Sequence, residues 1–409
     1  MKNPFVEQSF MQNPESVLGP LREKSSVARV KLPIIGQVWM TTTAQATSAM
    51  LKDNECFTMR KTDSSRGRQV AGVQWWMPRS IQLLANNMLT HDEPDHRRLR
   101  KLVDQAFQRR SVLALKTQTE TIAQSFVANI VREAQEKGSG ELVAGFARPF
   151  PMAVICELLG MPHALKQEFS QQAARMSTMS GVVSFLSALM PIRKMRAMVS
   201  EVIKDTQNRV KNGEPTEGLI AELVQAEADG ERLSHDELIA MVFLLLIAGH
   251  ETTSHLISGS VVALLENPDQ QRWLFEKPEH MDLAVEELLR FVSPVQFSKP
   301  RHVQQNKTFY GAELKKGDLI MAGLAAANYD PAEFDEPDQL NLTRRPNPHM
   351  EFGTGIHFCL GFQLARLELK IALQVLFSNL PEMQMGTDGP KWGQRMGLRV
   401  VERLPILVK

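Results

Sequence analysis

FGTGIHFCLGFQLAR, residues 352–366, holds one of only three cysteines in a chain of 409 residues. Cys359 follows a glycine-rich corner and comes just ahead of an expected helix. Gly353 and Gly361 can reach backbone angles that other residues avoid, so several backbone N–H groups could point at one sulfur. The positive end of the helix dipole favours an anion at the same place. Both effects predict a thiolate at Cys359.

A thiolate held in this way, with no second cysteine nearby, suits the axial position of a haem iron. Each N–H···S bond would contribute about 1.5–3 kcal/mol, the range for hydrogen bonds to charged groups. The stretch taken by itself equally allows a buried, inert cysteine in a glycine turn. The remaining motifs bear on this choice.

AGHETT, residues 248–253, follows an apolar run and is expected to be helical. Thr252 could donate to a carbonyl one turn earlier and open the helix locally, which would leave room for a water or a diatomic ligand. Glu251 could then relay protons inward. The alternative is a helix exit with ordinary caps. His250 and His255 are expected to be structural, as lone helical histidines usually are.

Four cationic or titratable side chains could face an anionic ligand. His96 and Arg100 are four residues apart and share one helix face. Arg301 and His357 lie far away in the sequence. A haem carries two propionates, which suit charge-assisted bonds from Arg and His. The alternative is a set of solvated surface charges.

EELLR supplies Glu287 and Arg290, which are three residues apart and therefore on one helix face. An exposed pair of this kind would contribute less than about 1 kcal/mol. It matters only if it is buried and joined to a loop.

Composition places the chain among ordinary globular proteins, with 43% apolar and 23% charged residues. The formal net charge of +1 gives no field for nucleic acid. Three widely spaced cysteines argue against a disulfide framework and fit a reducing cytoplasm. The first residues have no apolar core, so neither a signal peptide nor a membrane anchor is expected. The run 238–249 is too short to span a bilayer and predicts a buried helix.

The pattern along the chain predicts a mainly α protein with a small β part, forming a single domain over 1–409. A β-rich part is expected at about 25–60, with two strands around a Pro-Gly turn, and a helical core at about 90–295. Gly181 and Pro191 are expected to interrupt that core. Short strands, a meander and the cysteine loop follow, the last two spanning 328–361. One helix comes after Cys359, and the tail MGLRVVERLPILV predicts a closing hairpin.

These pieces in this order resemble the cytochrome P-450 family of haem-thiolate monooxygenases, of the soluble bacterial type. The resemblance covers nearly the whole chain, from DEPDHRRLRKLVDQAF through AGHETT, EELLRFVSP and GDLIMAGLAAANYDP to the cysteine loop. The haem loop of the family, FGxGxHxCxG, is met in full by Phe352, Gly353, Gly355, His357, Cys359 and Gly361.

The resemblance implies a cytochrome P-450 fold, with haem b between a distal kinked helix and the proximal cysteine loop and helix. Cys359 is the implied iron ligand, and Phe352 the ring that shields its sulfur. Thr252 is implied to bind dioxygen at the iron and Glu251 to deliver protons. The other implied haem contacts are the distal residues Ala248 and Gly249, the loop glycines Gly353 and Gly361, and the propionate partners His96, Arg100, Arg301 and His357.

The resemblance also implies a structural role for Glu287 and Arg290, which would steady the meander, with Arg344 as a third partner. The chain departs from the usual family pattern at Tyr329, Asn341, Thr343 and Glu351. These departures bear on meander packing and partner docking rather than on the chemistry.

The implied substrate pocket is lined by Leu244, Ile247, Ala248, Val295, Gln296 and Phe297. The Trp75-Trp76 loop and the Met-rich segment 176–190 would form its roof. Such a lining suggests a moderately hydrophobic natural product, terpenoid or aromatic. The alternative for each residue is ordinary core packing.

The chain has no flavin or ferredoxin module and no GxGxxG, so a separate ferredoxin and ferredoxin reductase are expected to supply electrons to a monomeric enzyme. A basic cluster could dock the ferredoxin: Arg97, Arg98, Lys101, Arg109 and Arg110. Two other enzymes are alternatives. A phenol-coupling oxidase would share every motif and differ only in its product, whereas a peroxide-driven oxidase would use the same thiolate but usually lacks the pair formed by Glu251 and Thr252. A non-catalytic haem sensor or carrier belongs to a different class and would not need Thr252.

Overall fold

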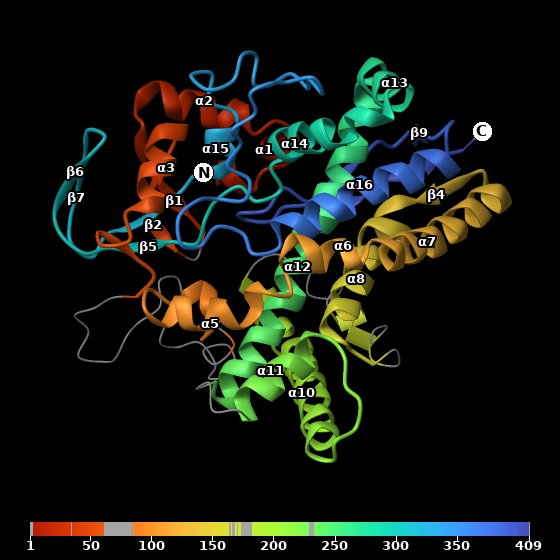
Figure 1. Ribbon diagram of the computed structural model, residues 1–409. Coiled ribbons are helices and arrows are strands. Elements are labelled where there is room, and N and C mark those ends of the chain that lie inside the picture. Colours follow the sequence, from red (N-terminus) through yellow and green to blue (C-terminus); the bar gives the residue numbers. More distant parts are fainter. Residues whose placement is uncertain are drawn as a thin grey trace.

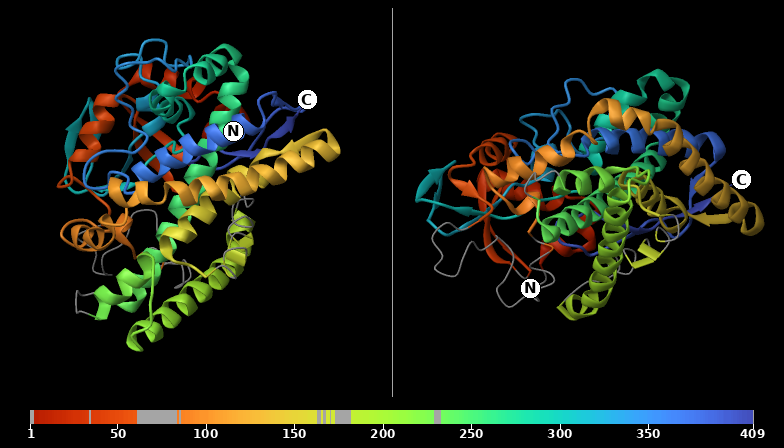
Figure 2. Two further views of the ribbon diagram at one scale, coloured as in Figure 1. Left: turned by 45° about the vertical axis from the view of Figure 1, so that its right-hand side comes forward. Right: turned by 60° about the horizontal axis from the view of Figure 1, so that its bottom comes forward.

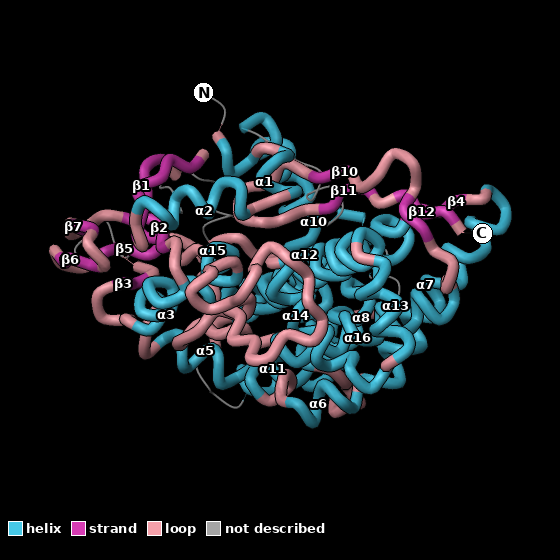
Figure 3. Tube along the Cα trace, turned by 90° about the horizontal axis from the view of Figure 1, so that it is seen from above, coloured by secondary structure: helices cyan, strands magenta, loops and turns pink. Residues whose placement is uncertain are grey.

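The structure is a computed structural model that describes every residue except 1–2, 34, 61–83, 85, 163–164, 166–167, 170, 173–181, 229–232 and 409. Its longest described helix, α12 (His235–Glu266), passes through the middle of the molecule (Figure 1). β1, β2, β5, β6 and β7 lie to the left of α12 together with α2 and α3, whereas β4 and β9 lie to its right (Figure 1). The view from above shows the same two groups of strands at opposite sides of the molecule (Figure 3).

The helices of the described residues follow the order of the chain. Before α12 these are α1 (Gln8–Gln12), α2 (Glu15–Lys24), α3 (Ala44–Lys52), α5 (Asp95–Asp104), α6 (Arg109–Ala114), α7 (Lys116–Lys137), α8 (Pro149–Leu159), α10 (Val182–Lys211) and α11 (Leu219–Ala228). After α12 come α13 (Pro268–Glu276), α14 (Met281–Val292), α15 (Leu324–Asn328) and α16 (Phe362–Asn379). Short turns of helix are η1 (Pro4–Val6), η2 (Met88–Thr90), η3 (Val143–Ala147) and η4 (Pro278–His280).

The main sheet has five strands in the order β1-β2-β8-β5-β3. Its strands are β1 (Val27–Leu32), β2 (Gly36–Thr41), β3 (Phe57–Thr58), β5 (Arg301–Val303) and β8 (Leu319–Met321). The predicted pair of strands around the Pro-Gly turn is confirmed, since β1 and β2 pair antiparallel from Val27 opposite Thr41 to Leu32 opposite Gly36. β2 and β8 pair in parallel, so the strands near the N-terminus lie beside a strand that follows the helical core in the sequence.

The tail does not form the predicted hairpin. β11 (Val401–Arg403) pairs with β10 (Lys391–Trp392), whereas β12 (Pro405–Leu407) pairs with β4 (Ser139–Glu141) and β9 (Gln384–Met385). Only Leu404 separates β11 from β12, and a hairpin needs a turn of at least about two residues. A separate ribbon is formed by β6 (Lys307–Phe309) and β7 (Ala312–Leu314).

α12 begins with a capping box, in which Ser234 Oγ accepts from the Glu237 N–H and the Glu237 carboxylate accepts from the Ser234 N–H. It contacts α8, α10, α14 and α16, so it is apolar on nearly all sides. Among the described helices it is the one long and apolar enough to cross a membrane by composition, but 61% of its apolar window is buried inside the protein. A core helix has this property.

Pro191 does not interrupt the helical core as predicted, because α10 continues through it. The C-terminal part of α10 buries Met195, Val199 and Val202, and the helix contacts α11 and α12. Packing of this face keeps the helix continuous despite the hydrogen bond that a proline cannot donate. Figure 2 shows α7 and α10 extending on the side of the molecule away from the main sheet.

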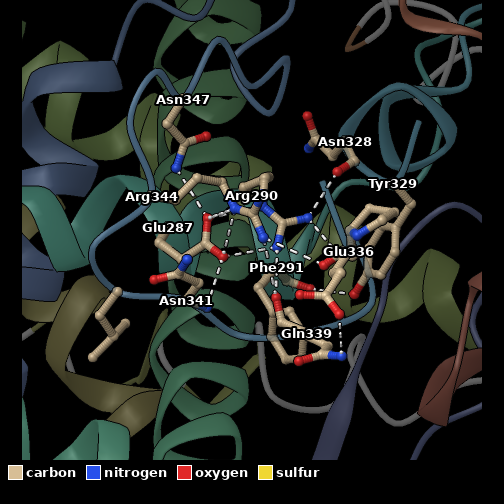
Figure 4. A network of polar contacts seen from close by, with 12 residues as sticks. Glu287, Arg290, Phe291, Asn328, Tyr329, Glu336, Gln339, Asn341, Arg344 and Asn347 are labelled. Carbon is tan, nitrogen blue, oxygen red and sulfur yellow. Dashed lines mark hydrogen bonds and ion pairs between the residues drawn. The ribbon is translucent and has the colours of Figure 1, made fainter. Parts of the chain in front are cut away.

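Glu287 and Arg290 form a fully buried ion pair on α14, beneath the meander (Figure 4). Arg290 Nε and Nη2 each donate to the Glu287 carboxylate at 2.8 Å. The remaining donors reach meander carbonyls, Nη1 to Asn328 O and Pro337 O and Nη2 to Gln339 O. The pair therefore joins α14 to the irregular chain that leads to the cysteine loop.

Arg344 completes this cluster from the meander side. Its Nε lies 3.2 and 3.1 Å from the two carboxylate oxygens of Glu287. The same carboxylate accepts from the Asn341 N–H and from Asn347 Nδ2, both at 3.0 Å (Figure 4). A buried carboxylate that loses such partners is left uncompensated, at a cost of about 3–5 kcal/mol.

The unusual meander residues fit this packing. Tyr329 is buried, donates to Phe291 O at 2.6 Å, and stacks its ring 5.7 Å from the Arg290 guanidinium carbon. Asn341 Oδ1 accepts from Thr343 Oγ1 at 2.7 Å, which closes a local turn.

Candidate active site

One cavity of about 410 Å³ lies where α5, α12, the segment 294–301, the cysteine loop and α16 meet. Most of the side chains singled out in the sequence line it. These are His96, Arg100, Leu244, Ala248, Gly249, Thr252, Val295, Phe297, Arg301, Phe352, Gly353, His357, Cys359 and Gly361. Cys359 is the only thiol among the described lining residues.

The glycines of the loop serve different needs. Gly353 and Gly355 have positive φ, +66° and +76°, and a Cβ on Gly355 would stand 2.5 Å from Leu51 O. Gly361 does not use the backbone freedom expected of it, because its φ is −84° and it caps α16. The Cys359 N–H donates to Phe352 O at 2.9 Å, which closes the loop around the sulfur.

The surroundings of the Cys359 sulfur act on its protonation in opposite directions. Burial raises the pKa of the Cys359 thiol to about 11, and the Gly361 N–H and the charge of Arg100 oppose this shift without cancelling it. One backbone N–H acts on the sulfur, not several. The protein alone therefore favours the thiol at neutral pH, and a thiolate requires a cation bound to the sulfur.

Phe352 is held in place by a charged group that the sequence analysis did not single out. The Arg366 guanidinium carbon lies 4.6 Å from the centre of the Phe352 ring. Arg366 Nε and Nη2 each donate to the Glu286 carboxylate at 2.6 Å, and His349 Nε2 lies 3.0 Å from the same carboxylate. The two adjacent glutamates of EELLR therefore have different partners: Glu287 binds the meander, and Glu286 binds Arg366 and His349 on either side of the cysteine loop.

The four candidate propionate partners come together at one end of the cavity. The rings of His96 and His357 meet edge to face with centres 4.5 Å apart. Arg100 Nη1 donates to Ile356 O and Phe358 O, at 3.1 and 2.7 Å, and so braces the cysteine loop. Arg301 is buried, and its pKa is lowered by burial to about 10, so it stays charged at neutral pH.

His357 Nε2 at this end is buried and has no hydrogen-bond partner among the described residues, whereas His96 Nδ1 lies 3.8 Å from Glu93 Oε1. Burial, with help from the nearby cations, lowers the pKa of His357 to about 2, so its ring is neutral and can donate only one hydrogen bond. An unpartnered ring nitrogen of His357 beside Arg100 and Arg301 fits a carboxylate of a haem. The residues present therefore fit the group that the sequence predicts.

On α12, Thr252 Oγ1 donates to Ala248 O at 2.8 Å, one turn earlier. The helix is nevertheless continuous through this turn, without the predicted local opening. Gly249 has a packing role, because a Cβ there would stand 3.2 Å from Cδ1 and Cγ1 of Ile155 on α8. His250 and His255 are buried, and burial lowers their pKa values to about 4 and about 3.

Glu251 does not line the cavity. Its carboxylate is paired with the Arg395 guanidinium, from the chain between β10 and β11. No local pattern in the sequence marks Arg395, since the contact joins positions 144 residues apart.

Two of the predicted pocket residues face elsewhere. The segment 295–301 is extended, so Val295, Phe297 and Arg301 share one side and Gln296 takes the other. Gln296 Nε2 donates to Ser293 O at 2.8 Å and its side chain is fully buried. Ile247 packs against the core rather than lining the cavity. Trp75, Trp76 and residues 176–181 of the predicted roof lie outside the described residues.

Glu351, an unusual residue before Phe352, is also buried against the cavity. Its carboxyl group accepts from the Val295 N–H at 2.9 Å and from Asn328 Nδ2 at 3.3 Å. Burial raises its pKa well above the ordinary value. Glu351 therefore joins the cysteine loop to the segment that carries the pocket side chains.

Comparisons with known proteins agree with this geometry. The family model described as Cytochrome P-450 matches residues 61–280 and 275–398. The chain is 36% identical over 405 residues to the polyketide biosynthesis cytochrome P-450 PksS of Bacillus subtilis, covering 98% of this chain and 96% of that protein. It is 36% identical over 402 residues to vitamin D(3) 25-hydroxylase of Pseudonocardia autotrophica, covering 97% and 94%.

Solved structures give the same result. A myxobacterial cytochrome P-450 in complex with myristic acid superposes with a TM-score of 0.88 and 32% sequence identity, covering 99% of this chain and 98% of that one.

Replacement of Glu286 by Gln should remove a pH-dependent part of the stability. Its bonds to Arg366 and His349 oppose burial and lower the pKa of Glu286 from 4.5 to about 2. A lowered folded-state pKa stabilises the protein above the unfolded value and loses that effect as pH falls toward 2. We expect Glu286→Gln to lose about 1–2 kcal/mol at pH 7, because the group is partly exposed, and little at the acid end.

Urea unfolding followed by circular dichroism at a series of pH values measures this difference. Glu276→Gln, which changes an exposed carboxylate on α13, is the matched control and should differ from the parent by less than about 0.5 kcal/mol at every pH. A deficit of Glu286→Gln that stayed constant down to pH 3 would contradict the assignment.

Proposed function

The chain belongs to the cytochrome P-450 family, and on that premise we propose how its own residues hold haem b, move protons and receive electrons. It is a monooxygenase of the bacterial type, in accord with relatives named as hydroxylases and epoxidases. Bound haem supplies the oxygen activation and the transfer of one oxygen atom to the substrate. The residues of this chain supply binding, orientation and protons.

Cys359 is our proposed iron ligand, and the observation that carries the proposal is its position as the only thiol on the cavity wall. His96, Arg100, Arg301 and His357 would hold the two propionates. Support comes from the unpartnered buried Nε2 of His357 and from the charge of the arginines. Phe352, braced by Arg366, would cover the sulfur.

Thr252 and Glu251 would manage protons. The Thr252 hydroxyl donates its proton to Ala248 O, so its oxygen lone pairs stay available to accept a hydrogen bond from the cavity. Glu251 is held by Arg395 outside the cavity lining, so it has to exchange this partner before it can pass a proton inward. Arg395 thereby sets the resting position of the proton donor.

The substrate we propose is a moderately hydrophobic natural product, terpenoid or aromatic. The pocket wall offers Leu244, Val295 and Phe297, with Thr252 as a polar point. One relative named above belongs to polyketide biosynthesis and another is a vitamin D(3) 25-hydroxylase, and the solved structure named above contains myristic acid. Polyketides, vitamin D(3) and myristic acid are largely apolar molecules.

A separate ferredoxin is our proposed electron donor, docking on the cysteine side of the cavity. Arg109 and Arg110 are exposed at the start of α6, which contacts α16. Lys101 is exposed on α5. Two members of the predicted basic cluster form ion pairs within the protein. Arg98 pairs with Glu237 at 2.6 Å, and Arg97 pairs with Glu93 at 3.3 Å.

The cytoplasm is the compartment we propose, since the relatives are bacterial and all three cysteines are free.

Reduction under carbon monoxide tests the iron ligand. The haem-loaded protein should give the strongly red-shifted Soret band of a thiolate complex, and Cys359→Ser should abolish it. Cys156→Ser is the matched control, a buried cysteine outside the cavity lining, and should keep the band. A band typical of histidine ligation in the parent protein would refute the proposal.

Thr252→Ala tests the proton role and separates an enzyme from a haem sensor or carrier. The product formed per dioxygen consumed should fall by about tenfold, with the balance appearing as hydrogen peroxide, while Thr252→Ser retains most of it. Oxygen uptake and product are measured together. Equal coupling in the Ala variant and the parent would argue against this role.

Reversal of Arg109 and Arg110 to Glu tests the electron donor. The rate of first-electron transfer from a [2Fe–2S] ferredoxin should fall by about tenfold at low salt and converge with the parent at high salt. Reversal of Lys204 and Lys211, exposed on α10, is the control for net charge. If rates and their salt dependence stayed unchanged, the docking face would lie elsewhere.

A further inference from the structure

Lys299 lies on the cavity wall between an apolar end and a cationic end. Side chains alternate along the extended segment, so Phe297, Lys299 and Arg301 all face the cavity. Phe297 stands at the apolar end, with its ring 5.5 Å from the ring of Phe5. Arg301 stands at the other end, where its Nη1 donates to Leu51 O. Hydrogen bonds between Ser298 and Ala322 hold the backbone on either side of Lys299 in place.

Lys299 is an exposed residue, and its side chain forms part of the cavity wall. The side chain is nevertheless surrounded by protein closely enough that burial lowers its pKa. Burial is the cause of this shift, and no described carboxylate is paired with Lys299. A charge in such surroundings is costly unless it meets a partner.

Among the described residues the protein supplies no such partner. Other cations of the chain have one, as when Lys307 Nζ lies 2.6 Å from Asp53. The two acids that line the cavity, Glu351 and Glu368, are buried, and burial raises their pKa values well above the ordinary range. Neither acid is paired with Lys299, so among the described residues the cavity holds a lysine without an acidic partner.

We propose that Lys299 binds the carboxylate of the substrate, so that the enzyme takes a mainly apolar acid whose anionic end lies at Lys299 and whose apolar body lies along Phe297 and Leu244. This inference rests on the proposed function, because it places the ligand in the monooxygenase pocket. The ammonium is a point charge on a flexible stem, which suits a carboxylate on ligands of differing shape.

A haem propionate is the other carboxylate that could reach Lys299. Four side chains already converge at the propionate end: His96, Arg100, Arg301 and His357. Lys299 lies on the same side of the extended segment as Arg301, but two residues nearer to Phe297. The two sources are distinguished by haem retention, which a propionate partner would affect and a substrate partner would not.

Binding to the ferric haem-loaded protein tests the proposal through the spectral shift that follows loss of water from the iron. The probes are straight-chain acids from octanoic to hexadecanoic, each against its uncharged primary amide. The parent should bind its best acid about tenfold or more tightly than the matching amide at low salt. Lys299→Met should lose this preference, and Lys299→Arg should keep most of it.

Lys277→Met removes an exposed lysine outside the cavity lining and should behave as the parent. Transfer of haem to apomyoglobin should proceed at the same rate in Lys299→Met and the parent. The proposal is overturned if no acid in the series binds more tightly than its amide, or if Lys299→Met keeps the preference. It is also overturned if Lys299→Met loses haem faster while it keeps the preference, since Lys299 would then serve a propionate. Failure of the proposed function would look different, because no probe would shift the spectrum.

Discussion

The fixed position of the cysteine loop depends on two adjacent carboxylates of α14 that face different parts of the chain. Glu287, with Arg290 and Arg344, binds the meander carbonyls before the loop, whereas Glu286 binds Arg366, whose guanidinium lies over Phe352 within the loop. Because Glu287 is fully buried, its ion pair stabilises the fold only as long as every partner is present. The loop can therefore hold a sulfur in one place without regular secondary structure of its own.

The electrostatics of the cavity follow from burial. Burial raises the pKa values of Cys359, Glu351 and Glu368, and lowers those of His357 and Lys299. Burial disfavours the charged form of the acids there, whereas Arg301 stays charged at neutral pH, so the cavity favours an anionic ligand. A ligand with carboxylates and a cation for the thiol would meet both needs at once, as haem does.

Sequence patterns located the elements whose cause is local. Glycines at positive φ, the apolar face of α16 and the β1–β2 hairpin were all predicted from short stretches. The errors came where distant packing prevails. Pro191 stays inside α10 because that helix is packed on its neighbours, and the tail splits because β11 and β12 join different strands. Gln296 was placed in the pocket by position, but alternation along an extended segment turns it away.

By itself the sequence determined the family, the cysteine loop and the set of side chains that could hold a haem, because those features lie in short stretches with strict local geometry. Tertiary structure alone decided which charges have partners. Glu251 pairs with Arg395 and Glu286 pairs with Arg366, whereas Lys299 pairs with no acid in the described part of the chain. Each outcome depends on segments far apart in the chain. The physical reason is that burial sets the energy of a charge, and burial exists only once the whole chain has packed.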